Sequence, residues 1–304
     1  MDEQERERHL GTLAATPARL KEVLAGVPKK LLLWTPAPGK WSIHEIVCHM
    51  RDMEREAYID RYRRILAEDN PVLPDIDGDA YAIVRDYRSM KLGEVLRDWA
   101  RLRKESLKLL KKVKGGQWER VGTHPTAGPL SVAAFLRRQA VGNDEAHLGQ
   151  LGAIKRRHQI LADLEAGPSA LAKETHALSD EKLRLRPSAD KWAIIEIACH
   201  LRDIERVYAE RFTKMAHQEK PAFWILDNAR AAEALRYREA DLRAVIKEWK
   251  RLREDTILLL RSLPHASWQR TGLHPERGER TVEQLASDLV GHDRNHLGRI
   301  KELA

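Results

Sequence analysis

Residues 39–62 read GKWSIHEIVCHMRDMEREAYIDRY, and residues 190–212 repeat the pattern as DKWAIIEIACHLRDIERVYAERF. The tryptophan of this motif recurs after 192 − 41 = 151 residues, and a histidine near the end of the unit recurs after 296 − 147 = 149 residues. A register that drifts so little indicates a tandem duplication with few insertions. Because the units of solenoid proteins are only about 20 to 50 residues long, a repeat of this length is a whole domain.

Within each repeat the apolar residues follow the period of amphipathic helices, and almost nothing alternates as a strand does. Proline is tolerated at the first position of a helix. Thr16 with Pro17, and Gly167 with Pro168, therefore predict the start of the first helix in each repeat.

Capping-box patterns mark the second and fourth helices, because a Ser or Thr is followed three residues later by Glu or Gln. Ser42 with Glu45 predicts the start of the second helix in the first repeat, whereas the aligned Ala193 requires a different cap. Thr281 with Gln284 predicts the start of the fourth helix in the second repeat.

The third helix of the first repeat is predicted over residues 92–113, with one apolar stripe that faces the core. A long link precedes it, and a loop with a His-Pro pair follows it. This order describes a four-helix bundle, so we expect an all-α chain of two tandem bundles related by a pseudo-two-fold axis. The last helix of the first bundle is expected to continue past Lys155 and to end at Gly167, which predicts domains at 1–166 and 167–304.

Three histidines of the second repeat, His200, His292 and His296, have the spacing of a metal site. The last two are four residues apart, so on a helix their side chains share one face, and the first lies on another helix. Three neutral imidazoles suit a divalent ion such as zinc or nickel and leave a coordination position open, as catalytic sites do. We predict a metal site at these residues.

The first repeat keeps two of these positions, His49 and His147, but has Asn143 where the second repeat has His292. An amide oxygen is less basic than an imidazole and lowers the affinity for a zinc-like ion. We therefore predict a degenerate, mostly empty site in the first domain. That domain would act as a packing partner, so the chain is expected to be an intramolecular pseudo-dimer and a monomer in solution.

Several neighbours of the histidines are weaker candidates. Asp203, and Asp52 in the first repeat, lie three residues after a histidine and are expected either to orient the ligand or to hold an arginine. Asp293 points about 100° away from His292 and is not expected to be a direct ligand. His274 lies near the start of the fourth helix, where it either shapes the loop or faces the mouth of the site.

Two further pairs of residues stand at matched positions beside the histidines. Trp41 and Trp192 precede their histidines by eight residues, and we assign them to the core rather than to a pocket wall. Cys48 and Cys199 immediately precede the same histidines, one in each repeat, so they form no disulfide within a repeat. We predict buried core thiols rather than reactive or ligating ones.

The chain carries a net charge of +8, with 54 basic and 46 acidic residues that interleave along the sequence. Such interleaving is typical of exposed helix faces, whereas nucleic-acid surfaces cluster positive charge or add aromatic side chains. We therefore do not expect a nucleic-acid partner. No apolar run is long enough to span a bilayer, and MDEQERERH at the start is too charged for a signal peptide, so a cytoplasmic protein is expected.

Three motifs together carry a resemblance to a known family. They are Trp192 to His200 with the following Leu-Arg-Asp-Ile-Glu, then HPERGERT at 274–281, and GHDRNHLGRI at 291–300. This pattern resembles the DinB or YfiT-like superfamily of metalloenzymes, and the resemblance covers both repeats. It implies two DinB-like bundles of up-down-down-up topology, with a metal held by one histidine of the second helix and two of the fourth.

Residue by residue, the resemblance implies His200, His292 and His296 as ligands in the second repeat, and His49 and His147 in the first, where Asn143 departs from the pattern. It further implies a thiol-dependent S-transferase that uses a low-molecular-weight thiol and a small-molecule substrate. The same ion would also activate water, which gives a metal-dependent hydrolase. A non-catalytic, stress-associated helical scaffold or metal-binding module is the other class that fits.

Overall fold

The computed structural model describes residues 1–36 and 39–304. The chain forms two compact units, Met1–Lys155 and Arg156–Ala304, which are described one at a time. Both are built mainly of helices, as predicted. Among the described residues, no helix is both long enough and apolar enough to cross a membrane.

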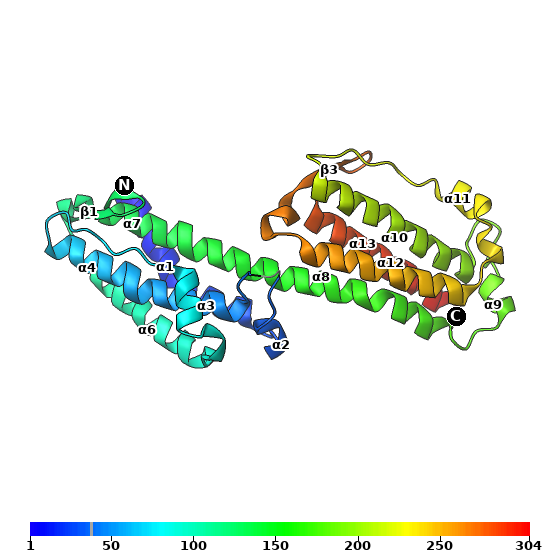
Figure 1. Cartoon of the computed structure of the whole chain (residues 1–304), viewed down its shortest axis with the longest axis horizontal. Coiled ribbons are helices and arrows are strands. Elements are labelled where there is room, and N and C mark those ends of the chain that lie inside the picture. Colours follow the sequence, from blue (N-terminus) through cyan, green and yellow to red (C-terminus); the bar gives the residue numbers. More distant parts are fainter. Residues whose placement is uncertain (37–38) are drawn as a thin grey trace. The chain divides into compact units, whose positions relative to one another are not determined.

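The first unit contains long helices and a small hairpin (Figure 1). Its elements are α1 (Glu3–Leu24), α2 (Lys29–Leu32), α3 (Ile43–Asp52), η1 (Met53–Tyr58), α4 (Ile59–Ala67), α5 (Gly78–Val84), η2 (Tyr87–Ser89), α6 (Leu92–Leu110), η3 (Gly115–Glu119), β1 (Val121–His124), β2 (Gly128–Ser131), α7 (Val132–Arg137), η4 (Arg138–Glu145) and the start of α8 (Ala146–Thr175).

The second unit repeats this order with fewer interruptions. After the later part of α8, its elements are α9 (Asp180–Arg184), α10 (Ile194–His217), α11 (Asn228–Ala234), η5 (Tyr237–Glu239), α12 (Leu242–Ser262), η6 (His265–Gln269), β3 (Thr271–His274), β4 (Gly278–Thr281) and α13 (Val282–Leu303).

The long helices of the second unit follow the expected up-down-down-up order. In Figure 1, α10 and α12 run in the same direction, because the link between them carries the chain back along the bundle, while α8 and α13 run the opposite way. The stripe predicted for the third helix is buried, with Val95 and Trp99 in α6 and Val245 and Trp249 in α12 all at most 3% exposed. The four-helix prediction is therefore confirmed.

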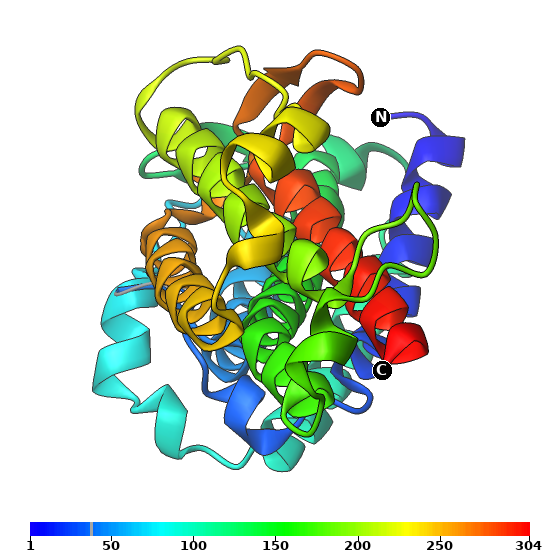
Figure 2. The ribbon, with the colours of Figure 1, turned by 90° about the vertical axis from the view of Figure 1, so that its right-hand side faces the viewer.

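The loop predicted before the fourth helix is a β-hairpin. Strands β3 and β4 pair antiparallel, with His274 opposite Gly278, and the first unit pairs β1 with β2 in the same way. The link after α10 joins the hairpin, since the backbone N–H of Phe223 donates to the Leu273 carbonyl at 2.9 Å. Figure 2 shows this hairpin at the end of the bundle where α13 begins. The hairpin therefore fixes the link beside His274.

The predicted capping boxes are present. Ser42 Oγ accepts from the Glu45 backbone N–H at 3.3 Å, and the Glu45 carboxylate accepts from the Ser42 N–H at 2.8 Å. Thr281 and Gln284 make the same exchange at 3.1 and 2.9 Å. At Ala193 half of the box remains, because its N–H donates to the Glu196 carboxylate at 2.9 Å.

The helix starts predicted at the two prolines are wrong. Pro17 lies inside α1 and Pro168 lies inside α8. Because proline has no N–H, each removes the donor to the carbonyl four residues earlier. A buried arginine supplies that donor in both units: Arg103 donates to the Leu13 carbonyl at 3.2 Å, and Arg253 donates to the Leu164 carbonyl at 2.7 Å. The helices therefore continue through proline.

The end predicted for α8 at Gly167 is wrong for the same reason, since the helix continues to Thr175. Gly167 serves packing rather than termination, because a Cβ there would lie 3.3 Å from the Asp293 carboxylate and 3.4 Å from Arg253. The predicted boundary between residues 166 and 167 falls inside this helix, and the compact units divide earlier, after Lys155. Residues 156–166 pack with the second unit, for example through Arg157 and Glu283 at 3.3 Å.

The long helices of the first unit contain two π-helical segments, η1 and η4, whereas α10 and α13 are α-helical throughout. From Ser131 to Gly142 the first unit takes 142 − 131 = 11 steps, and from Thr281 to Gly291 the second takes 291 − 281 = 10. The extra residue lies where η4 forms. The same is true of η1, because the repeat offset falls from 151 to 150 residues across it. Each insertion is therefore absorbed as a widened turn.

Candidate metal centre

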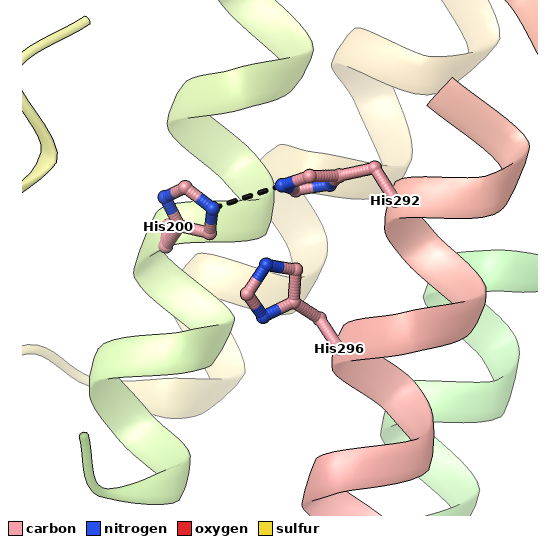
Figure 3. A group of neighbouring side chains, drawn as sticks. All are labelled: His200, His292 and His296. Carbon is pink, nitrogen blue, oxygen red and sulfur yellow. Dashed lines mark hydrogen bonds between the residues drawn. The ribbon is translucent and has the colours of Figure 1, made fainter. Parts of the chain in front are cut away.

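The structure brings together the three histidines that the sequence singled out in the second unit. His200 projects from α10, and His292 and His296 project from successive turns of α13 (Figure 3). One ring nitrogen of each lies within 4.8 Å of the other two. The Nε2 atoms of His200 and His292 are 2.9 Å apart, and the ring centres of His292 and His296 are 4.4 Å apart. This convergence across two helices is what a three-histidine site requires.

The protonation of the cluster suits a cation. Burial lowers the pKa of His200 to about 3, with His292 and His296 acting in the same direction. Burial likewise lowers the pKa of His296 to about 4. These imidazoles are neutral near pH 7, which is the form that binds a metal. The donor set fits a divalent ion because one ring nitrogen of each histidine converges on a common point. The Nδ1 atoms of all three rings are buried and have no hydrogen-bond partner among the described residues.

A pocket of about 520 Å³ opens over the cluster. The side chain of His292 is 23% exposed, so the histidines are accessible from this pocket. The wall combines aromatic and basic side chains, including Trp192, Tyr208, Arg211, His274, Arg277 and Arg299.

The tryptophan beside each cluster packs against the core of its unit, and Trp192 also faces the pocket. Trp192 lines the pocket, and its ring lies edge-on to His200 with ring centres 5.0 Å apart. Trp41 stands 4.6 Å from the ring of His49. Trp192 therefore packs against the core, as assigned, and also forms part of the pocket wall.

Asp203 holds arginines instead of orienting His200. Its carboxylate accepts from the Tyr237 hydroxyl at 2.6 Å and from Arg206 at 2.7 Å. In the first unit, Asp52 accepts from Tyr87 at 2.8 Å and from Arg85 at 2.7 Å. Of the two roles expected for these carboxylates, orienting a histidine or holding an arginine, the structure shows that they hold an arginine.

Asp293 lies beside the cluster, with Oδ1 3.8 Å from His292 Nδ1. Its carboxylate pairs with the buried Arg253 at 2.8 Å. The same guanidinium donates to Glu205 of α10 at 2.7 Å. This buried group ties α10, α12 and α13 together, one residue away from His292.

His274 has both of the roles expected for it. Its Nδ1 accepts from the backbone N–H groups of Glu276 and Arg277 at 3.2 and 3.3 Å, which shapes the hairpin turn. The residue also lines the pocket. Because burial lowers its pKa, with Arg211 as the next cause, the ring is neutral and its single proton is on Nε2.

The first unit holds its corresponding residues differently. The rings of His49 and His147 have centres 5.1 Å apart, and His147 Nδ1 contacts the Gln150 amide oxygen at 3.1 Å. Asn143 donates to the neighbouring Asp144 at 3.2 Å. Gly78, at the start of α5, lies so close to His49 that a Cβ would be 2.8 Å from its ring. Gly78 thus leaves room for the His49 ring, and both His49 and His147 are partly exposed.

Two basic residues of the pocket were missed from the sequence. Arg277 and Arg299 stand where the first repeat has Ala127 and Gln150. Aligning the two repeats would have found them, because the repeat with the complete triad has arginines at two positions where the other repeat has uncharged residues. A comparison restricted to histidines overlooks it.

The two cysteines are core residues, as predicted. Both are buried, and each Sγ lies 3.8 Å from a tyrosine carbonyl, that of Tyr87 for Cys48 and that of Tyr237 for Cys199. Burial raises the pKa of Cys48 to about 12 and that of Cys199 to about 11. Neither thiol is a nucleophile at neutral pH.

Comparison with known proteins identifies the class to which this fold and site belong. The sequence model of the DinB superfamily matches residues 12–151 and again residues 163–300. The chain therefore belongs to the DinB superfamily and contains its domain twice.

Individual relatives match one repeat at a time. The chain is 28% identical to the uncharacterized protein YuaE of Bacillus subtilis over 43% of this chain and 88% of that protein. It is 20% identical to a second protein of that organism, named "Putative metal-dependent hydrolase YfiT", over 52% of this chain and 88% of that protein. The solved structure of YfiT, an unusual four-helix bundle, aligns with a TM-score of 0.50 at 21% identity, covering 52% of this chain and 90% of that one. This likeness supports the fold.

Proposed function

We propose that the second unit is a metal-dependent enzyme with a single site, in which His200, His292 and His296 hold a divalent ion, zinc or nickel. The observation that carries the proposal is the convergence of three imidazoles beneath an accessible pocket. A structural site would be closed by a fourth protein ligand, whereas a catalytic one keeps a position for water or substrate. The name of the relative "Putative metal-dependent hydrolase YfiT" supports the same class.

The residues around the cluster have separate tasks in this proposal. When bound, the ion would lower the pKa of a water or a thiol in its open position and so supply a nucleophile at neutral pH. The three histidines hold that position between α10 and α13. Trp192 and Tyr208 wall the pocket and limit the entry of water, and His274 offers a hydrogen-bond donor at Nε2.

Two reactions use such a nucleophile. The resemblance of the motifs supports thiol-dependent S-transfer, in which a low-molecular-weight thiol loses its proton, its sulfur bonds to an electrophilic carbon, and a leaving group such as a halide departs from that carbon. The names of the relatives support hydrolysis, in which a water oxygen bonds to the carbonyl carbon of an ester or amide and the alcohol or amine leaves with a proton. A pocket open to solvent favours either reaction over a sealed, non-catalytic scaffold.

Metal analysis of chain purified without chelators tests the site. We expect about one ion per chain in the wild type and none in His292→Ala, because two imidazoles hold zinc-like ions weakly. His147→Ala, which changes the matched position of the first unit, is the control and should leave the content unchanged. A metal-free wild type, or a His292→Ala chain that keeps its ion, would contradict the proposal.

Product analysis separates the two reactions. The zinc-loaded chain would be given an electrophilic aryl halide with and without bacillithiol or mycothiol, and in parallel a panel of activated esters and amides. S-transfer predicts a thioether that requires the added thiol, whereas hydrolysis predicts cleavage without it. Either activity should fall by more than about 100-fold in His292→Ala.

A further inference from the structure

One carboxylate of the first unit has no counterpart in the second. Asp75 Oδ1 lies 3.6 Å from Nε2 of His124. Burial lowers the pKa of the neighbouring Arg61, and Asp75 opposes that effect, so its carboxylate acts on both groups. The residue at 75 + 150 in the second unit is Ile225, an apolar side chain.

The two groups that face this carboxylate are both kept in the second unit. Arg211 and His274 also stand 150 residues after their counterparts, 211 − 61 and 274 − 124. Arg211 donates to the Trp224 carbonyl at 2.8 Å, just as Arg61 donates to the Pro74 carbonyl at 2.8 Å.

The histidines are held alike as well. His124 Nδ1 accepts from the backbone N–H groups of Thr126 and Ala127, both at 3.3 Å, as His274 Nδ1 accepts from two N–H groups of its own turn. In both units the ring therefore presents Nε2 on its other side. In the second unit that side lacks the carboxylate, and both His274 and Ile225 line the pocket.

The second unit thus lacks the carboxylate that faces these groups in the first unit. The remaining nearby carboxylates are Glu276 and Asp288, which act to raise the pKa of His274, and Glu210, which acts to raise the pKa of Arg211. Arg211 is only 6% exposed, and its Nε has no hydrogen-bond partner among the described residues. Arg61 Nε is equally unpartnered, so the units differ here in residue 75, an aspartate, and its counterpart Ile225. Arg277, which replaces an alanine, brings a second guanidinium that Asp288 only partly offsets, at 3.3 Å.

We propose that the pocket of the second unit binds its substrate through a carboxylate, held by Arg211, His274 and Arg277 in the place that the Asp75 side chain takes in the first unit. Guanidinium and imidazole donors match the two oxygens of a carboxylate. Ile225, with Ile204 and Val207 of the same pocket, provides an apolar wall for the rest of the molecule. The bound molecule is a small organic acid whose other end reaches the three histidines. That this molecule is a substrate rests on the proposed function.

Calorimetric titration of the full chain with succinate tests this carboxylate site. The titration would be run on zinc-loaded and on metal-free chain, because the three donors do not include the metal ligands. We expect Ile225→Asp to weaken succinate binding at least about tenfold in both forms, since its own carboxylate fills the site. Ile225→Asn, of the same shape without the charge, should change the affinity less than about threefold.

A second variant guards against misfolding at residue 225. Arg277 lies on the exposed hairpin turn, so Arg277→Ala should fold normally and still weaken succinate binding about tenfold. Arg294→Ala, whose side chain is 76% exposed outside the pocket, is the control and should bind as wild type does.

Three outcomes would overturn the carboxylate site: wild type without measurable succinate binding, Ile225→Asp binding as tightly as wild type, or inorganic phosphate binding where succinate does not. Metal content, measured on the same samples, tests the proposed function separately. Suppose that wild type purifies without metal but still binds succinate, and that Ile225→Asp weakens this binding. That result would refute the metal site and support the carboxylate site. A wild type that holds zinc but does not bind succinate would support the metal site and refute the carboxylate site.

Discussion

The two units share one fold, but only the second keeps its two histidine-bearing helices as continuous α-helices. In the first unit those helices contain η1 and η4, each where the chain has one extra residue. A π-helical turn holds an additional residue without rotating the helix on either side of it. The comparison teaches that the bundle tolerates insertions near the site while the residues that face the core keep their positions.

The scaffold is preserved where the site is not. Both units bury an arginine that joins three helices and also binds the carbonyl freed by a proline, Arg103 in the first and Arg253 in the second. The third metal position, by contrast, is Asn143 in one unit and His292 in the other. The fold therefore depends on the buried arginine group rather than on a metal, and each unit provides a control for the other.

The two units should differ most in the free energy of unfolding when one residue is deleted from the matching helix of each. Deleting Val141, which is 50% exposed within η4, removes the extra residue and should change the free energy of unfolding by no more than about 1 kcal/mol. Deleting the aligned Val290 turns the first part of α13 by about 100°. Buried Leu285 and Leu289 would leave the core, at a cost of more than about 5 kcal/mol.

Hydrogen exchange followed by mass spectrometry would report each unit separately in both deletions. Loss of protection in the second unit alone is the expected result for the Val290 deletion. Equal loss from the two deletions would show that η4 does not mark an accommodated insertion.

The next largest effect concerns the buried arginines. Arg253→Ala would leave Glu205, Asp293 and the Leu164 carbonyl buried without their partner, and should lower the free energy of unfolding by about 3–5 kcal/mol. Because Asp293 is next to His292, zinc affinity should also fall, by about tenfold. Arg103→Ala should cost similar stability in the first unit.

Urea denaturation and a competitive zinc titration would measure these two changes. Zinc affinity should be unaffected by Arg103→Ala, which makes this variant the matched control. If Arg253→Ala unfolded the second unit less than Arg103→Ala unfolds the first, the buried group would not be the shared support of the two bundles.

The bundle could be predicted because its signals are local and repeated. Two capping boxes and the stripes around Trp99 and Trp249 act within a few residues, so they mark helices regardless of the rest of the fold. The continuation of α1 through Pro17 could not be read in this way. It depends on Arg103, which is 90 residues away in sequence and replaces the missing donor.

The residues of the candidate site also differ in whether local sequence signals could predict them. The histidine spacing is local on α13, and the repeat supplied the third member on α10, so the triad was predictable as a group. The roles of Trp192 and Asp203 depend on side chains that come from other elements, and the sequence left two alternatives for each. Arg277 and Arg299 carry no motif of their own, and only their absence from the first repeat distinguishes them from ordinary surface charges.

A third prediction restores the missing ligand. Asn143→His should raise the zinc affinity of the first unit about 100-fold, or about 2.7 kcal/mol, because His49 and His147 already lie with ring centres 5.1 Å apart. Metal content should rise from about one ion per chain to about two. Activity should not double, since Gly78 packs against His49 where the second unit has the pocket-lining Asn228.

The double variant Asn143→His with His292→Ala separates the two sites. It should hold about one ion, now in the first unit, and should show no activity. A content of zero would mean that the π-helical turn has displaced residue 143 from the ligand position, so that composition is not the only difference between the two sites.

The smallest effect is expected at the prolines. Alanine at residue 168 would give the Leu164 carbonyl a helical N–H donor in addition to Arg253, since a carbonyl oxygen accepts two hydrogen bonds. Relief of the helix defect is partly cancelled by the greater freedom of the unfolded chain, so Pro168→Ala should stabilise by about 1 kcal/mol. Pro17→Ala should stabilise slightly more, because Arg103 reaches the Leu13 carbonyl at 3.2 Å whereas Arg253 reaches Leu164 at 2.7 Å. Thermal unfolding of both variants would measure the difference, and destabilisation by either would mean that the arginine needs the proline to keep that carbonyl free.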